Sequence, residues 1–540
     1  MHHRVKRPTE VVAVGLSFSH GAVIRMGMIK REREQTSFCG EEGGTQPLLL
    51  PSSSSQDHDV EGGDRNVPLT PTFLLSIFAV ACGSFSTGCT IGYTSPVEYQ
   101  IIEELGISVG QYTVSGSMLV VGGLVGSLVG GKITEQIGRK RVRILTRNGH
   151  KFFWFLVYDK ESVTRTVNFV QTILVLDVLF IVGWLTIASA KGPLQLDVGM
   201  LLIGIAAPIN LYLSPMFVAE ITPSNLRGAA VSVTQLIMFC SVAFAFTVGS
   251  LISWRALALI GATTCLVQLL FTIFLIPESP RWLAKMGKEK EFEAALLQLR
   301  GGNADISWEV DEIKEYTKTI HSISKNSSIL DMFQKQYAIP LIVGNGLLMF
   351  QQFSGVNAYT MYTGAIFVSA GIPSTAGFLA VASFQVVGAF LTTALLDRCG
   401  RRPLLLAGVT GTCLGGLLTT LSFILQGFEG WSRVTPTLTL LGVMIYSGSF
   451  AVWNGIPWMI IAEIFPLNIK GSAGTMCCLS YNISALMVSS SFQTLLQWSP
   501  PGTFFIYASA SFIGIVFVSK LVPETTGKSL EELQSTFTHK

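Results

Sequence analysis

Residues 347–362 read LLMFQQFSGVNAYTMY, and this stretch decides both how the chain folds and where its polar interior lies. It begins as an apolar helix and then places the amides of Gln351, Gln352 and Asn357 among apolar neighbours, followed by two tyrosines. A primary amide offers donors and an acceptor without charge, which suits a ligand covered in hydroxyls. Inside a membrane an amide is costly unless it faces a partner or a wet cavity. A single amide more often joins two helices, but three so close together favour a polyol-binding site.

The composition indicates a polytopic membrane protein. The 540 residues are 49% hydrophobic and only 13% charged. The net charge of +3 is small and its Lys and Arg are spread over many loops, which argues against nucleic acid as a partner. The nine cysteines lie mostly in apolar runs without metal or disulfide spacing, and they are interpreted as packing residues. No catalytic set is apparent, so the chain is predicted not to be an enzyme and to need no cofactor and no metal.

About twelve apolar runs of spanning length predict as many transmembrane helices. They are placed at 72–94, 112–131, 173–190, 197–218, 230–251, 257–276, 338–357, 376–396, 403–426, 437–461, 473–495 and 503–522. Basic residues concentrate in the loops that follow every second run, so the positive-inside rule predicts that both termini are cytosolic. The segment 281–335 contains two amphipathic patterns, which predict helices in the central loop.

Three motifs recur in the same order and divide the chain into two six-helix halves. AEITPSNLRGAA (219–230) matches AEIFPLNIKGSA (462–473), IGRKR (137–141) matches CGRRP (399–403), and PESPRW (277–282) matches PETTGKS (523–529). Two parallel halves around a midplane site are typical of transporters. The predicted parts are a disordered cytosolic tail (1–70), a first half (71–276), a helical cytosolic loop (277–337), a second half (338–522) and a cytosolic tail (523–540).

The first half is longer than the second between matching motifs, and the excess is concentrated in residues 142–175. The apolar run 152–158 within this segment is far too short to cross a membrane. Two explanations stay open. The segment is either foreign to the working protein, as a translated intron or a splice form, or a genuine cytosolic loop.

Charged residues repeat at the predicted cytosolic ends of the helices in both halves. They are expected to pair as a latch that closes the cytosolic side, whereas simple positive-inside anchoring explains the arginines but not the repeated carboxylates. The latch residues are Glu135, Arg139, Arg141, Glu220, Asp397, Arg398, Arg401, Arg402 and Glu463.

One segment imitates a nucleotide-binding motif. GSLVGGKIT (126–134) nearly matches a phosphate-binding loop, but Ile133 stands where Ser or Thr is needed, and the run lies in a predicted membrane helix. Nucleotide binding is therefore excluded. The partners expected are a small-molecule sugar and the lipid bilayer.

Three further residues are candidates for the same cavity as the amides of 347–362. Gln235 and Gln385 are isolated amides within predicted spans, and each alone is more often a packing residue. Trp458 follows Pro457 and offers an indole face and an N–H group to a sugar ring.

The motifs IGRKR with DRCGRR, PESPRWL, QQFSGVN, IPW and VPETTGKSLEEL resemble those of the sugar porter branch of the major facilitator superfamily. The resemblance covers roughly residues 70–535 and is greatest to the plant early-responsive-to-dehydration-six-like monosaccharide transporters. It implies an all-α membrane protein with twelve transmembrane helices in two pseudo-symmetric halves, which moves hexoses such as glucose or fructose by alternating access. The sugar-binding positions that it implies are Gln235, Gln351, Gln352, Asn357, Gln385 and Trp458.

The chain departs from the family pattern at several positions. Met200 stands after Gly199 where the family has an arginine that is expected to belong to the latch, and Tyr481-Asn482 replaces an Asn-Trp pair. Proton-coupled relatives carry an aspartate in the first span where this chain has Thr90, and no other carboxylate is identified in the middle of a span. Facilitated diffusion is therefore expected. The alternatives are proton-coupled transport across the vacuolar membrane and a non-transporting sugar sensor.

The expected location is a membrane of the vacuole or the cell surface. Glu41 and Glu42 precede the leucines of 48–50, which resembles an acidic dileucine sorting signal for vacuolar membranes. An ordinary tail with three leucines explains the same residues, so the vacuolar and the plasma membrane both stay open.

Overall fold

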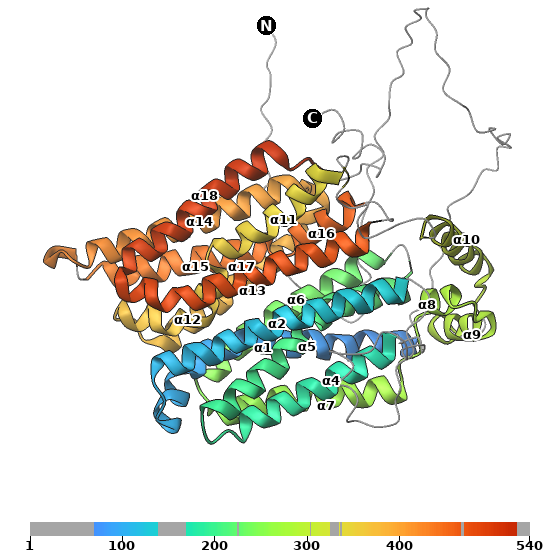
Figure 1. The fold of residues 1–540 in the computed structure, drawn as a ribbon, viewed down its shortest axis with the longest axis horizontal. Coiled ribbons are helices and arrows are strands. Elements are labelled where there is room, and N and C mark those ends of the chain that lie inside the picture. Colours follow the sequence, from blue (N-terminus) through green and yellow to red (C-terminus); the bar gives the residue numbers. More distant parts are fainter. Residues whose placement is uncertain are drawn as a thin grey trace, which may run out of the picture. The chain divides into compact units, whose positions relative to one another are not determined.

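The structure, a computed structural model, describes residues 70–138, 169–223, 226–302, 304–324, 334, 337–431, 433–465 and 469–525. Nearly all of these residues are helical, as predicted (Figure 1). Residues 1–69 of the predicted N-terminal tail, 142–168 of the extra segment and 526–540 of the C-terminal tail lie outside the described residues. The last seven residues of the extra segment are described and form the start of a helix at Phe169.

The helices follow the two predicted halves. The first half contains α1 (Pro71–Leu105), α2 (Val109–Gly138), α4 (Phe169–Ala188), α5 (Pro193–Ile221), α6 (Arg227–Gly249) and α7 (Trp254–Phe274). The central loop forms α8 (Pro280–Lys285), α9 (Glu289–Arg300) and α10 (Ser307–Ser324). The second half contains α11 (Ala338–Phe353), α12 (Val356–Ser369), α13 (Ser374–Cys399), α14 (Arg401–Leu425), a 3₁₀ turn η3 (Glu429–Trp431), α15 (Thr435–Trp453), α16 (Ile456–Ile464), α17 (Lys470–Trp498) and α18 (Pro500–Leu521).

Eleven stretches of the described chain are long and apolar enough to cross a membrane. They match all the predicted spans except 473–495, which corresponds to α17. With 29 residues, α17 reaches about 44 Å and is long enough to span. Its polar side chains find partners on neighbouring helices: Ser480 donates to Asn345 of α11 at 2.6 Å, and Asn482 donates to Ser127 of α2 at 2.8 Å. The low hydropathy of α17 thus reflects a face turned to protein rather than to lipid.

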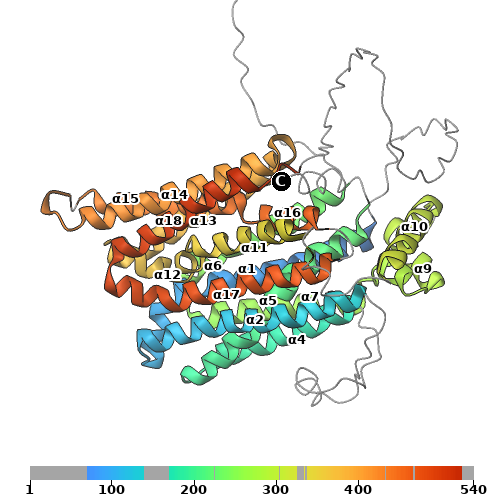
Figure 2. The ribbon, with the colours of Figure 1, turned by 45° about the horizontal axis from the view of Figure 1, so that its top comes forward.

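Each half has its own hydrophobic core. The first core contains large buried aromatics such as Tyr93 and Trp184, whose rings meet edge to face at 5.2 Å, and it extends into α9 through Phe292. The second core is built mainly from α11 to α18 and also takes in Val120 of α2 and Val242 and Phe246 of α6. The halves meet where α2 packs on α17, α6 on α13 and α1 on α12 (Figure 2). A site between the halves is therefore bordered by these three helix pairs.

Two spans of the second half are broken. Between α11 and α12, Gly355 adopts φ 92°, and a Cβ atom at this position would lie 2.6 Å from the ring of Tyr507. Between α15 and α16 the helix is interrupted at Asn454 and Gly455. A break inside a membrane frees backbone groups that must be paired within the protein or line a cavity.

The helices α8, α9 and α10 dock on the first half. The side chain of Arg300 is almost fully buried and forms two hydrogen bonds to the carboxylate of Glu309, at 2.8 and 3.0 Å. A third hydrogen bond runs from Arg300 to the carbonyl oxygen of Ile221 at 2.9 Å, where α5 ends. Thr70 caps α1 and donates to the carbonyl oxygen of Leu299 at 2.8 Å. These contacts fix α9 against the ends of α1 and α5.

Candidate functional site

Gln351 connects the break between α11 and α12 to the break between α15 and α16. This residue lies in the last turn of α11 and is fully buried. Its Nε2 donates to the backbone oxygen of Asn454 at 3.0 Å and to the side-chain oxygen of Asn454 at 3.1 Å. The amide of Gln351 therefore satisfies a carbonyl group that the break between α15 and α16 exposes.

Gln352 and Asn357 form a second polar contact across the break between α11 and α12. Asn357 Nδ2 donates to Gln352 Oε1 at 2.9 Å, and Gln352 is fully buried. Tyr481 of α17 interacts with the side chain of Gln352, and its ring lies 5.6 Å from that of Trp458 on α16. The structure thus brings together four of the six residues that the sequence assigned to sugar binding.

Three amide oxygens among the described residues of the second half are buried without a hydrogen-bond partner. They are Oε1 of Gln351, Oε1 of Gln385 on α13, a side chain that is 7% exposed, and Oε1 of Gln493 on α17. Buried polar groups are nearly always paired, so an unpaired amide oxygen marks a place where a donor from a ligand or a water is accommodated. A sugar hydroxyl is such a donor.

Gln235 and Gln385 are not joined to this group. Among the described residues no hydrogen bond links either of them to Gln351, Gln352 or Asn357. Gln235 instead borders a small cavity between α1, α5 and α6, in the first half. The polar side chains that line this cavity with it are Ser84, Thr87, Asn210, Ser214 and Thr234. The structure therefore places Gln351, Gln352, Asn357 and Trp458 near one another but joins neither Gln235 nor Gln385 to them, and the shared cavity stays a prediction.

One ion pair of the predicted latch is present. Arg401, in the first turn of α14, lies 3.1 Å from Glu463 of α16. Arg402 instead donates to the backbone oxygen of Ser519 at 2.6 Å, and Arg398 is exposed and makes no ion pair with a described residue. Arg139, Arg141 and the side chains of Glu135 and Asp397 lie outside the described residues.

Glu220, the counterpart of Glu463 in the first half, accepts a hydrogen bond from the hydroxyl of Ser279 in the PESPRW motif. Burial lowers the pKa of the Lys285 ammonium, and the neighbouring Glu220 carboxylate opposes this shift. The two repeated carboxylates thus have different neighbours, although their sequence motifs match.

Glu524, which the sequence analysis placed in the C-terminal tail, contacts the start of α14. Its two carboxylate oxygens accept the backbone N–H groups of Arg401 and Arg402, each at 3.1 Å. The first N–H groups of a helix have no partner within the helix and carry partial positive charge, so a carboxylate stabilises them. The segment 523–525 is therefore packed on α14, and the assignment of 523–540 as a tail is corrected for these residues.

The expectation that the family's arginine at the position of Met200 belongs to the latch does not fit this structure. Met200 lies near the start of α5 and is 1% exposed, whereas Glu220 lies at the other end of the same helix. Twenty residues of helix separate them by about 30 Å. The missing arginine at this position is therefore too far away to change the contacts around Glu220.

The expectation that no other carboxylate lies in the middle of a span is wrong for Asp177, which stands in the middle of α4 and is 1% exposed. Glu98 lies beyond the predicted span 72–94 but still within α1, and it is 3% exposed. One oxygen of each carboxyl group is buried without a hydrogen-bond partner. Asp177 was visible in the sequence within a long apolar stretch, and so was Asn454, which the sequence analysis treated only as a departure from the family pattern.

A profile described as "Sugar (and other) transporter" matches residues 168–537. The chain belongs to this family. Among sugar transporters it is similar to "Sugar transporter ERD6-like 15" of Arabidopsis thaliana, with 42% identity over 92% of this chain and 98% of the relative. "Sugar transporter ERD6-like 7" of the same plant is 40% identical over 85% of this chain and 93% of its own length. The resemblance to the ERD6-like branch of the sugar porters is confirmed.

Solved structures of the major facilitator superfamily share the fold of this sugar transporter family member. The proton:xylose symporter XylE bound to 6-bromo-6-deoxy-D-glucose has a TM-score of 0.64 at 22% identity, covering 86% of this chain and all of that one. The inward-open form of the xylose transporter XylE from E. coli has a TM-score of 0.63, over 85% of this chain and 99% of that one. The predicted major facilitator fold is confirmed.

Proposed function

We propose that the chain moves monosaccharides, hexoses such as glucose or fructose, across a membrane by alternating access of its two halves. Membership of the sugar transporter family supports transport of a sugar. The observation that carries the site is the buried Oε1 of Gln351, which lies unpaired where two broken helices meet. Discontinuous helices at the middle of a membrane are where transporters hold their substrates.

Uptake of radiolabelled glucose and fructose by proteoliposomes tests this function. Carrier-mediated uptake that saturates and is inhibited by the unlabelled sugar is expected. A sugar sensor on the same fold would bind the sugar without moving it, so saturable binding without uptake would support that alternative instead.

We propose facilitated diffusion as the mode of transport. Thr90 occupies the position of the proton-coupling aspartate and its hydroxyl donates to the backbone oxygen of Ser86 at 3.0 Å. Asp177 interacts with Cys82 and Cys265 inside the core of the first half. Its helix α4 packs on α5 and α7 of the same half, whereas the first span α1 contacts α12 of the other half, so Asp177 lies on a helix away from the contact between the halves, where a coupling carboxyl group is less favoured.

A protonophore is therefore expected to leave sugar uptake unchanged at equal pH on both sides. An inwardly directed pH gradient is likewise expected not to concentrate the sugar. Accumulation above the outside concentration that the protonophore abolishes would show proton coupling, and Asp177→Asn would then be the variant to examine.

We propose that the pair of Arg401 and Glu463 stabilises the closed state of the cytosolic side. The two side chains are 21% and 32% exposed, so the interaction is worth about 1 kcal/mol at most. Arg401→Ala is expected to slow uptake about fivefold or less while the protein level in the membrane holds. Arg398→Ala, which removes an exposed arginine without an ion pair to a described residue, is the matched control and is expected to transport normally. Equal rates for both variants would contradict the latch.

We propose that both termini are cytosolic and that the protein resides in the vacuolar or the plasma membrane. The excess of basic residues in alternate loops supports the orientation. Accessibility of terminal tags to protease in sealed vesicles tests the orientation, and the location of a fluorescent fusion distinguishes the two membranes.

We propose that residues 142–168 are dispensable for transport. The excess length of the first half supports this, and the described helix α4 starts directly afterwards at Phe169. A variant without 142–168 is expected to transport at least as fast as the full chain. Loss of transport, together with abundant peptides from this segment in membranes, would show that it is a genuine cytosolic loop.

A further inference from the structure

Glu98 is a buried carboxyl group at the contact between the two halves. It lies on α1, about 40 Å along the helix from Pro71 and so at the end of the bundle opposite α9. Its side chain is 3% exposed and Oε2 is buried without a hydrogen-bond partner. Glu98 belongs neither to the candidate sugar site nor to the predicted latch.

The helix that covers Glu98 belongs to the other half. One turn before Glu98, the hydroxyl of Ser95 accepts a hydrogen bond from the backbone N–H of Gly364 on α12 at 3.0 Å. A Cβ atom at Gly364 would lie 3.3 Å from the backbone oxygen of Ser95, so α1 and α12 are in close contact here. Separation of the halves at this end would remove α12 from Glu98 and admit water.

The backbone of α12 has two places at which it departs from a regular helix. It begins after Gly355, whose φ is 92°, and it is kinked at Tyr362, with φ −121° and ψ 20°. Tyr362 is also the residue of α12 that interacts with Glu98. The helix α12 thus departs from regular helical geometry both at its start and beside the carboxyl group of Glu98.

The titratable groups that interact with Glu98 are tyrosines from three helices, namely Tyr99 of α1, Tyr112 of α2 and Tyr362 of α12. The hydroxyl of Tyr112 is already committed, since it donates to the backbone oxygen of Thr94 at 2.5 Å. None of these groups carries positive charge. A buried carboxylate without a cation is strongly disfavoured against the neutral acid.

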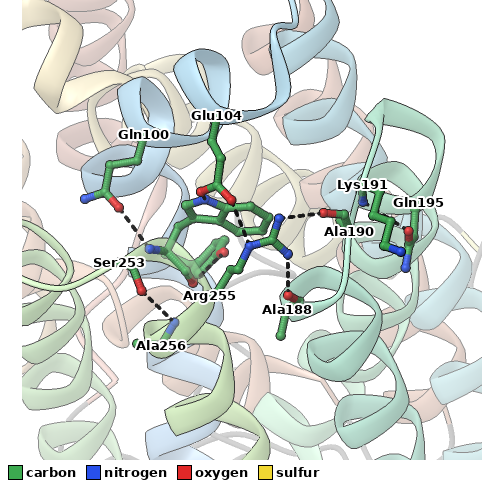
Figure 3. Close-up of polar contacts among 11 residues, drawn as sticks. Gln100, Glu104, Ala188, Ala190, Lys191, Gln195, Ser253, Arg255 and Ala256 are labelled. Carbon is green, nitrogen blue, oxygen red and sulfur yellow. Dashed lines mark hydrogen bonds and ion pairs between the residues drawn. The ribbon is translucent and has the colours of Figure 1, made fainter.

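The nearby charged groups on the other helices around α1 are engaged elsewhere. Arg255 of α7 donates to Glu104 at 3.0 Å and to the carbonyl oxygens of Ala188 and Ala190 at 2.6 and 2.9 Å (Figure 3). Asp197 of α5 accepts from the hydroxyl of Ser115. The only charged residue in the sequence of α6 is Arg227, which lies at the end of that helix away from Glu98.

We propose that Glu98 is a proton-binding site that is filled when α12 closes against α1 and emptied, to the same side, when they separate. This inference rests on the proposed alternating access. The carboxyl group is neutral under α12 and becomes hydrated and ionised when the helices part. Closing therefore takes up one proton from that side, and the pH there sets the balance between the open and closed states without driving net transport. The ratio of closed to open protein falls by up to tenfold for each unit rise in pH over the range in which this uptake occurs.

A distance measurement that needs no sugar tests the proposal. Cys39, Cys240 and Cys399 are first replaced by serine so that they take up no label. Spin labels are then attached to cysteines introduced at Val109 of α2 and Val368 of α12, both of which are exposed, and the distance between the labels reports the separation of the halves at this end. In the labelled protein in lipid, the short-distance fraction is expected to fall as the pH rises from 5 to 8. In Glu98→Gln, whose amide cannot ionise, this fraction is expected to stay high throughout.

Glu103→Gln is the matched control, because Glu103 lies on the same helix and is exposed. It is expected to behave like the parent protein. A pH-independent distance in the parent, or an unchanged pH dependence in Glu98→Gln, would overturn the proposal. Both results are obtained without transport, so they are distinct from a failure of sugar uptake, which would overturn the proposed function alone.

Discussion

Replacing Gln351 by Leu is expected to weaken the apparent affinity for sugar roughly tenfold or more. The leucine removes the buried Oε1 that is free to accept from a sugar hydroxyl, and it removes the two hydrogen bonds to Asn454. Leaving a buried polar group unpaired costs about 1–3 kcal/mol. The measurement is the concentration dependence of glucose uptake in proteoliposomes, normalised to the amount of protein reconstituted.

Monodeoxy analogues of glucose separate a sugar contact from a purely structural role of Gln351. If its amide binds one particular hydroxyl, the parent protein discriminates against the analogue that lacks this hydroxyl, and Gln351→Leu does not. If Gln351 only joins the two broken helices, the variant loses affinity for glucose and for every analogue by the same factor. The second pattern would contradict the assignment of Gln351 to the sugar site.

The arrangement of the halves was predictable because it depends on features that repeat along the chain. Apolar runs of spanning length and three motifs in the same order are sufficient to place two six-helix halves, and the structure adds only the breaks within two spans. The amides of Gln351 and Gln352 stood out because polar groups are rare within such runs. Local composition alone thus predicted the buried amides near Gly355 that form part of the candidate site.

What the sequence did not show is which groups meet across the fold. The contact of Gln351 with Asn454 depends on two helix breaks facing each other, and no local pattern encodes that pairing. Glu524 was placed in a tail because a short polar segment after the last span resembles one, although its carboxylate caps α14. The latch role expected of the family's arginine at the position of Met200 was wrong because the motif position was transferred without regard to which end of the helix it occupies.

Breaking the buried ion pair of Arg300 and Glu309 is expected to release the helices α8 to α10 from the first half. The two side chains are 4% and 12% exposed, and the guanidinium also binds the last carbonyl group of α5. Arg300→Met leaves the carboxylate of Glu309 buried without its cation, which typically costs about 3–5 kcal/mol. Since proteolysis of a reversibly opening segment follows its opening equilibrium, trypsin is expected to cut this segment more than roughly a hundredfold faster.

The double variant Arg300→Met with Glu309→Leu separates the loss of a pair from the burial of a lone charge. Replacing a buried ion pair by apolar side chains of similar size is often neutral, because the desolvation cost of both charges disappears. The double variant is therefore expected to resist trypsin far better than either single variant, with a remaining loss from the unpaired carbonyl group of Ile221. Lys288→Met is the control, because the pair of Lys288 and Glu291 is 47% and 59% exposed and contributes little. If the double variant is cut as fast as Arg300→Met, the attraction between the charges themselves holds α9 on α5, and the explanation by a buried lone charge is wrong.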